Sequence, residues 1–205
     1  MQFNVGTLKD LKMIIAKKLV LGFLLMLFSQ LAAADIFDSL YIATDIGRSK
    51  FLSACSGVTP AYTKCKDYDF SNRSSLGILV ADFTNAELGY FSSGKASKKG
   101  AGNTSNEIDS VEWQLSGMRY FPIGDGRLNS FVRMGLVHWE VSEAKTVGHL
   151  NTSGNSVLLG VGGKFFITKN IALRAHLETH KIGNSRNSWS GNVLFMGTGL
   201  TYQFN

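Results

Sequence analysis

After residue 34 the chain alternates between apolar and polar side chains with a period of two residues, in runs separated by turn-rich segments. The clearest run is the last, NVLFMGTGLTYQFN, in which every second residue from Leu194 to Phe204 shares one face. Successive side chains of a β-strand point to opposite faces of a sheet, so this period indicates strands. No comparable run has helical spacing. We therefore predict an all-β protein.

Eight strands follow from this pattern, over residues 40–51, 72–80, 84–92, 108–121, 128–142, 156–167, 171–181 and 192–204. The connections between them alternate in length. Segments 81–83, 123–127 and 168–170 are short turns, whereas 52–71, 93–107, 143–155 and 182–191 are long and polar. Outer-membrane barrels have this asymmetry, because their periplasmic turns are short and their surface loops are long. The pattern predicts an eight-stranded antiparallel up-and-down transmembrane β-barrel.

The two faces of the predicted strands differ in chemistry. One face is apolar from strand to strand and suits contact with lipid, as Ile42, Leu88 and Met134 illustrate. The interior of an eight-stranded barrel is just wide enough for side chains to fill it. Acids and bases gathered there can nearly neutralise one another, so we predict an internal salt-bridge cluster. Its members are Asp45, Glu87, Glu112, Arg133, Lys164, Arg174, His176 and Glu178.

The first 34 residues have the organisation of an export signal. Four lysines, of which Lys18 is the last, precede the apolar run LVLGFLLMLF, and Ala32 and Ala34 suit an A-x-A cleavage site. The run has about ten residues, and a spanning helix needs about 20. We predict a cleavable signal over residues 1–34 and a barrel domain over residues 35–205. Either Met1 or Met13 could be the start.

Two cysteines, Cys55 and Cys65, lie in the first long polar segment. In an exported chain, two thiols in one loop favour a disulfide; the alternative is two free thiols. The formal net charge is +6, and the signal contributes half of it through four lysines and one aspartate. Such a mild balance, without a basic helix or a stacking motif, does not indicate nucleic acid as a partner.

The stretch RAHLETH places Arg174, His176, Glu178 and His180 on the inner face of one predicted strand. We interpret this ladder as part of the internal salt-bridge wall. The alternative is a zinc site formed by His176, Glu178 and His180, since imidazole and carboxylate are suitable ligands. Three residues on one strand spread over about 13 Å, so a neighbouring strand would have to complete the site. No metal and no cofactor is predicted.

An enzymatic alternative rests on His180 and the serines of the following KIGNSRNS. Some eight-stranded outer-membrane barrels deacylate or acylate lipid A with a His and a Ser near the outer leaflet. In the deacylases the Ser follows the His at close alternate spacing, whereas Ile182 stands at that position here. The sequence shows no paired carboxylates, phosphate-binding glycine loop or nucleophile elbow. We therefore expect no enzymatic activity.

Several segments resemble the OmpA-like transmembrane β-barrel domains of Gram-negative outer membranes. They are LYIATDIGRSKF, LGILVADFTNAELGYFSSGKAS, WQLSGMRYFPIGDGRLNSFVRMGLVHWEV and GLTYQF, in this order. The resemblance implies a polar, largely plugged interior in which an acid on the third strand pairs with arginines on later strands. Glu87 matches that acid, and Arg133 and Arg174 match the arginines. Met118 stands where the best-known member has an inward lysine.

A surface role is expected from the long segments. Lys64 and Lys66 in the first, with Lys95, Lys98 and Lys99 in the second, form a predicted basic patch near lipopolysaccharide phosphates or a host polymer. The expected function is envelope integrity and surface adhesion in the cell outer membrane. The alternatives are a lipid A-modifying enzyme and a narrow solute channel. The expected partners are lipid, lipopolysaccharide, a surface ligand and, during biogenesis, the barrel assembly machinery, and the protein is expected to be a monomer.

Overall fold

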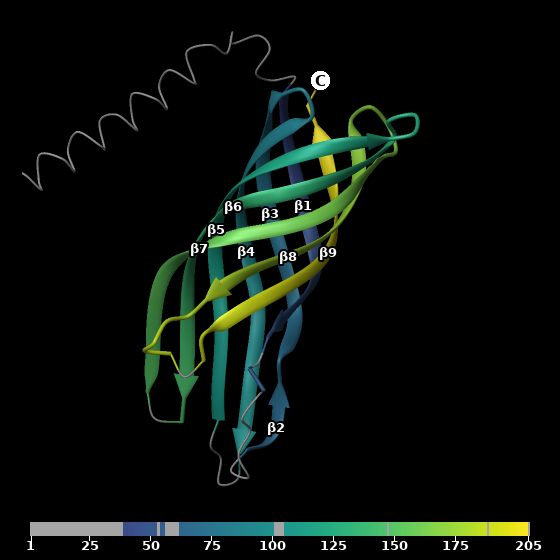
Figure 1. The fold of residues 1–205 in the computed structure, drawn as a ribbon. Coiled ribbons are helices and arrows are strands. Elements are labelled where there is room, and N and C mark those ends of the chain that lie inside the picture. Colours follow the sequence, from purple (N-terminus) through teal and green to yellow (C-terminus); the bar gives the residue numbers. More distant parts are fainter. Residues whose placement is uncertain are drawn as a thin grey trace, which may run out of the picture. The chain divides into compact units, whose positions relative to one another are not determined.

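The computed structural model describes residues 39–52, 54–55, 62–100, 105–146, 148–187 and 189–204. The predicted signal over residues 1–34 lies outside them. The described part of the chain contains nine strands (Figure 1). They are β1 (Leu40–Phe51), β2 (Tyr62–Lys66), β3 (Tyr68–Ala81), β4 (Thr84–Gly100), β5 (Ser105–Ile123), β6 (Leu128–Lys145), β7 (His149–Phe166), β8 (Ile171–Ile182) and β9 (Gly191–Gln203).

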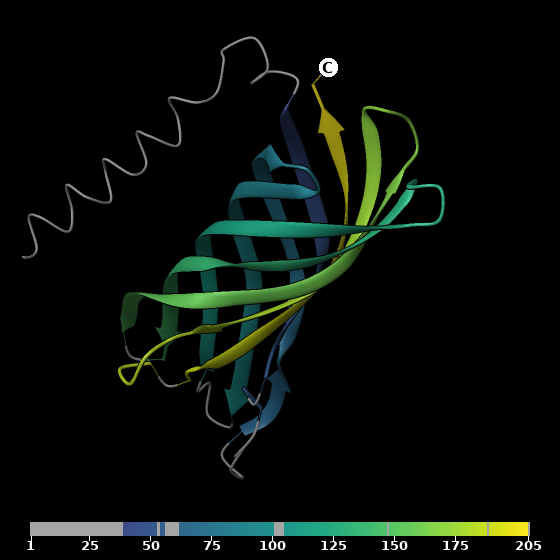
Figure 2. The same ribbon diagram turned by 45° about the horizontal axis from the view of Figure 1, so that its top comes forward.

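Eight of these strands close into a ring, as the view in Figure 2 makes plain. Every neighbouring pair is antiparallel, and β1 completes the ring by pairing with both β3 and β9. The ninth strand, β2, stands outside the ring and pairs only with the far end of β4. Closure gives the ring strands a hydrogen-bonded neighbour on each side, which is what a sheet needs in lipid. The predicted eight-stranded up-and-down barrel is confirmed.

The strands reach further at the long-loop end than the sequence predicted. Segments 93–107 and 143–155 were expected to be loops, but β4 and β5 stay paired out to Lys99 and Ser105, and β6 and β7 out to Ala144 and His149. The prediction of loops was wrong there because both faces of these segments are largely polar, so the side-chain period is weak. The backbone hydrogen bonds between neighbouring strands nevertheless continue through these segments. Strand β2 pairs with the extended part of β4.

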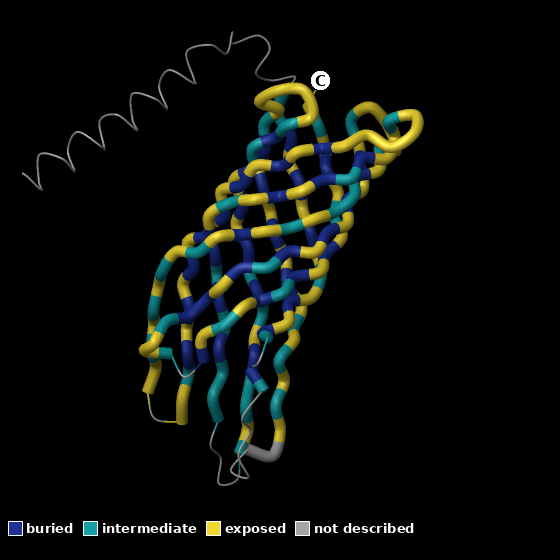
Figure 3. The backbone as a smooth tube through the Cα atoms, viewed as in Figure 1, coloured by how far each residue is buried: buried dark blue, intermediate teal, exposed yellow. Residues whose placement is uncertain are grey.

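The outer face of the barrel is apolar, as predicted. Met134, Leu136 and Leu115 are each more than half exposed, and alternate positions on the same strands are buried (Figure 3). Outward aromatic side chains gather at two levels, which is the arrangement of interfacial girdles. Tyr68, Phe70, Tyr90 and Trp113 lie toward the long-loop end, and Phe83, Phe121, Phe165 and Tyr202 toward the short-turn end. Among the described residues, no helix is long and apolar enough to cross a membrane.

The interior consists of a polar centre between two apolar clusters. The cluster at the short-turn end comprises Tyr41, Ala43, Met118, Tyr120 and Phe131. The larger cluster at the long-loop end includes Phe51, Trp139, Leu158, Trp189 and Val193. Met118 is only 1% exposed and points inward, in agreement with its predicted place. The charged side chains between these clusters are therefore screened from solvent at both ends.

The predicted disulfide between Cys55 and Cys65 is present, and it joins the segment after β1 to strand β2. We expect neither cysteine to react with a thiol reagent in unreduced, denatured protein, and both to react after reduction. Replacing both with serine should lower the free energy of unfolding by up to about 3 kcal/mol, and by less where the barrel already fixes the ends of the loop. Mass spectrometry after alkylation checks the bond, and reaction of both thiols without reductant would contradict it.

Candidate functional site

The centre of the barrel holds a buried network of ion pairs around Arg174 of β8. The Arg174 guanidinium donates from Nε to Asp45 Oδ1 at 2.7 Å and from Nη2 to Asp45 Oδ2 at 2.6 Å. Its Nη1 donates to Glu87 of β4. Planar guanidinium groups suit such two-pronged contacts with carboxylates. Arg174 thus links β8 to two strands that are not its neighbours in the sheet.

Two further arginines complete the network. Arg73 of β3 donates from Nε to Asp45 Oδ2 at 2.9 Å and from Nη1 to Glu178 Oε2 at 2.6 Å. Arg133 of β6 donates from Nη1 to Glu178 Oε1 at 2.8 Å, and its Nη2 lies 3.3 Å from Glu87 Oε2. Each of the three carboxylates therefore contacts two arginines. Three positive and three negative charges meet, so the network is neutral.

Arg73, which is fully buried at 0% exposure, was not among the predicted members of the cluster. The signal was available, because Arg73 alternates with the outward residues Asn72 and Ser74 of the same strand. Its neighbours in SNRSS are all small and polar, however, so the two faces of the strand do not differ in polarity around Arg73. The predicted strand over residues 72–80, with Leu76 and Ile78 facing outward, already placed Arg73 on the inward face, as the structure shows.

The two histidines of the ladder have different partners. His176 Nε2 lies 2.9 Å from Arg73 Nη2 and must accept that hydrogen bond, since a guanidinium only donates. His180 Nε2 lies 2.9 Å from a carboxylate oxygen of Glu112, which also accepts from Ser110 and Gln114. The alternative zinc site would need both histidines on one ion. No group of three or more potential ligands suited to a metal occurs among the residues that the structure describes.

Lys164 was predicted as a member of the salt-bridge cluster, but it lies apart from the arginine network. Its Nζ sits 5.3, 5.6 and 4.8 Å from the ring centres of Tyr41, Tyr120 and Phe166. Within the described ranges no carboxylate forms an ion pair with it. Of the eight predicted members, five belong to the arginine network through ion pairs, His176 borders it, and Glu112 pairs with His180 instead.

The predicted surface lysines lie on paired strands, and not on loops. Lys64 of β2 stands directly opposite Lys99 of β4, and Cys65 stands opposite Lys98. Lys66 forms an exposed ion pair with Asp69 at 2.6 Å. The structure adds two exposed basic residues from β1 at the same end of the barrel. We call the exposed basic residues of β1, β2 and β4 at this end the basic rim: Arg48, Lys50, Lys64, Lys66, Lys95 and Lys99. The predicted Lys98 is half-buried and is not one of them.

The basic rim begins at the outer level of aromatic side chains and extends past it along β2 and the far end of β4. In the register of the sheet Lys50 stands opposite Tyr68 and Arg48 opposite Phe70, and the Arg48 guanidinium lies 5.8 Å from the Tyr68 ring centre. Lys66 is two residues from Tyr68 on the outward side of the chain. Aromatic girdles mark the boundary between hydrocarbon and headgroups. Positive charge beyond them would lie at the level of lipid headgroups.

A closed ring of eight antiparallel strands, apolar outside and ion-paired inside, defines an outer-membrane β-barrel. The family model described as the OmpA-like transmembrane domain matches residues 36–205, so the chain belongs to that family. The family is one of bacterial outer-membrane proteins, as are the similar structures.

Two solved structures illustrate the likeness of fold. Neisserial surface protein A is 16% identical, with a TM-score of 0.59 over 80% of this chain and 97% of that one. OprG from Pseudomonas aeruginosa is 12% identical, with a TM-score of 0.54 over 82% of this chain and 98% of that one. At these identities the likeness concerns the fold alone. No curated protein matches the chain in sequence.

Proposed function

We propose that this protein is a non-enzymatic barrel of the cell outer membrane that supports the envelope and binds anionic surface molecules, lipopolysaccharide phosphates first among them, through the basic rim. The observation that carries the proposal is the position of the rim at the outer aromatic level and beyond it. Export through the signal over residues 1–34 and insertion by the barrel assembly machinery belong to the same proposal. The short turns would then face the periplasm.

The charges within the rim support an anionic partner. Lys64 and Lys99 face each other on paired strands, so positive charge is concentrated at this point of the rim, where like charges directly opposite destabilise a sheet. Asp109 stands opposite Lys95 and Asp69 pairs with Lys66, so two rim lysines are partly offset. The attraction should therefore centre on Lys64 and the basic residues of β1. Salt screens it over about 8 Å at physiological strength.

The interior supports a structural role for the barrel. The arginine network is neutral, with each carboxylate in contact with two arginines, and an apolar cluster packs in the lumen on each side of it. His180, the residue on which the deacylase alternative depends, is 3% exposed and points into the lumen toward Glu112. A lipid-modifying group would have to reach the outer face of the barrel. The same filling of the lumen weighs against a solute channel.

Replacing Lys50 and Lys64 with serine tests the proposed partner. Lipopolysaccharide binding by the barrel in phosphatidylcholine nanodiscs should weaken roughly fivefold per lysine at low salt, since each basic residue near an anionic surface contributes about 1 kcal/mol. Raising the salt should shrink the difference between variant and wild type. Surface plasmon resonance measures both, and dephosphorylated lipopolysaccharide should bind the two proteins alike.

The matched control removes two positive charges from the opposite end of the barrel, Arg127 and Lys169, and should bind lipopolysaccharide as the wild type does. Equal loss in both variants would mean that net charge, and not the rim, governs binding. No loss in the rim variant at either salt concentration would refute the proposed partner. A lipid A mass spectrum that changes when the gene is deleted would instead support the enzymatic alternative.

A further inference from the structure

The short-turn end of the barrel contains an open cavity of about 630 Å³. Seven of the eight ring strands or their turns contribute to the wall of this cavity. The cavity therefore occupies the mouth of the lumen and does not lie on the outer surface of the barrel. Aromatic and aliphatic side chains make up much of the wall, with amide groups from Asn85, Asn129 and Gln203 among them. Pockets that bind small molecules typically have volumes of about 300–1,000 Å³, mostly apolar walls and a few polar groups, and this cavity has all three properties.

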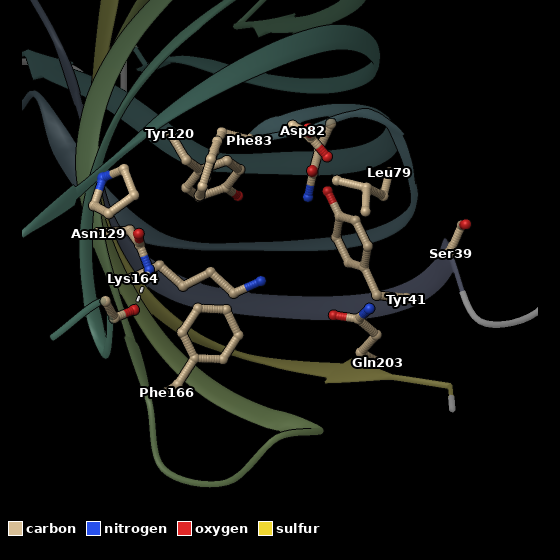
Figure 4. Close-up of a pocket in the computed structure, with 13 residues that line it drawn as sticks. Ser39, Tyr41, Leu79, Asp82, Phe83, Tyr120, Asn129, Lys164, Phe166 and Gln203 are labelled. Atoms are coloured by element: carbon tan, nitrogen blue, oxygen red, sulfur yellow. Dashed lines mark hydrogen bonds between the residues drawn. The ribbon is translucent and has the colours of Figure 1, made fainter.

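Lys164 of β7 brings a charge into this cavity. The residue is only 5% exposed, and its side chain runs between Phe166 and Tyr120 with the ammonium group toward Tyr41 (Figure 4). The three rings face the ammonium, which is a favourable contact for a cation. Rings do not neutralise the charge, however, and they accept no conventional hydrogen bond from it.

The acids of the lumen already have other partners. Asp45, Glu87 and Glu178 balance the three buried arginines, and Glu112 pairs with His180. Glu143 lies in the long-loop extension, with Lys145 at 3.4 Å. Asp82 is the one carboxylate in the wall of the cavity; it is exposed on the β3–β4 turn and forms no ion pair with Lys164 among the described residues. The Lys164 charge is thus left without a compensating carboxylate.

We propose that this cavity is a binding site for a small organic anion, a carboxylate on an apolar body the size of one ring, that enters from the short-turn end. A buried charge is costly unless it is paired, and a carboxylate at Lys164 would supply the missing partner. The apolar body would pack against Tyr41, Tyr120 and Phe166. An inorganic anion would meet the charge but would leave these apolar walls without contact.

Benzoate is a suitable probe, with benzamide as its neutral counterpart. In nanodiscs of zwitterionic lipid, benzoate should shift the NMR signals of residues 120, 164 and 166 saturably in the millimolar range, and benzamide should bind at least about tenfold more weakly. Lys164→Met should lower benzoate affinity by a similar factor without changing that for benzamide. Lys164→Arg, which keeps the charge, should retain benzoate binding. Asp82→Asn should tighten it by removing a like charge at the rim of the cavity.

Lys169→Met is the matched control, because Lys169 is an exposed lysine on the β7–β8 turn at the same end of the barrel. It should leave benzoate binding unchanged. Three results would overturn the proposal: no saturable benzoate binding by the wild type, equal binding of benzamide and benzoate, or displacement of benzoate by equimolar chloride. The first two need only the wild type, so the test stands even if Lys164→Met does not fold.

Discussion

Arg174→Ala should lower the free energy of unfolding by about 3–5 kcal/mol, because breaking a buried ion pair leaves uncompensated charge in the lumen. Asp45 would keep only Arg73, and Glu87 would keep only Arg133 at 3.3 Å. Glu178 does not contact Arg174 and should be little affected, since Arg73 and Arg133 hold it. Urea titration of the barrel in nanodiscs, and the temperature at which the folded band is lost on a gel, measure the effect.

A second substitution makes this prediction specific to charge. Glu87→Gln in the Arg174→Ala background restores neutrality and should recover part of the lost stability. Arg127→Ala is the control, because Arg127 forms an exposed pair with Asp125 at 3.6 Å, and such surface pairs contribute about 0–1 kcal/mol. If Arg174→Ala behaved like Arg127→Ala, or if Glu87→Gln deepened the loss, the network would not stabilise the barrel as described.

Gly199→Val should prevent the barrel from closing correctly. Gly199 of β9 faces Asp45 across the seam between β1 and β9, the pairing that completes the ring. A Cβ atom at this position would lie 2.1 Å from the backbone oxygen of Thr44 and 2.2 Å from Asp45 Oδ1. Backbone cannot yield as a flexible side chain can, and Asp45 is held by two arginines. The expected result is loss of the compact, heat-modifiable form in refolding assays.

Gly117→Val provides the comparison for Gly199→Val. Gly117 also lies within a ring strand, but a Cβ atom there would have only the Asn85 backbone oxygen nearby, at 3.9 Å. Valine is favoured in strands, so this variant should fold at least as well as the wild type. Normal folding of Gly199→Val would show that the seam between β1 and β9 can open enough to admit a side chain, contrary to the description given above.

Local pattern was enough to predict most of the barrel. Residues 40–51 and 171–181 were placed to within one residue of β1 and β8, because apolar outward positions alternate there with polar or small inward ones. The same pattern failed beyond Ser92 and Ser142, where strands continue with polar residues on both faces. Backbone pairing is independent of side-chain polarity, so a strand that leaves the lipid can persist without a signal in its sequence.

The basic patch shows a similar division. The lysines were found from the sequence, yet their placement on facing strands required the structure, since Lys64 and Lys99 are 35 positions apart and meet only through the pairing of β2 with β4. Strand β4 is longer than its neighbour β3, and β2 pairs with the part of β4 that extends past the start of β3. Arg48 and Lys50 were not included in the prediction, because the level at which β1 ends relative to β2 is not a local property.

The sequence by itself determined which side chains face the lipid and which face the lumen, because this depends on the two-residue period of a single strand. Only the tertiary structure decided which lumen residues meet. Arg73, Arg133 and Arg174 come from three different strands, and their contacts with Asp45, Glu87 and Glu178 depend on the stagger of the closed sheet as a whole. For the same reason Lys164, on the same face as its predicted partners, lies nearer the short-turn end, among aromatic rings.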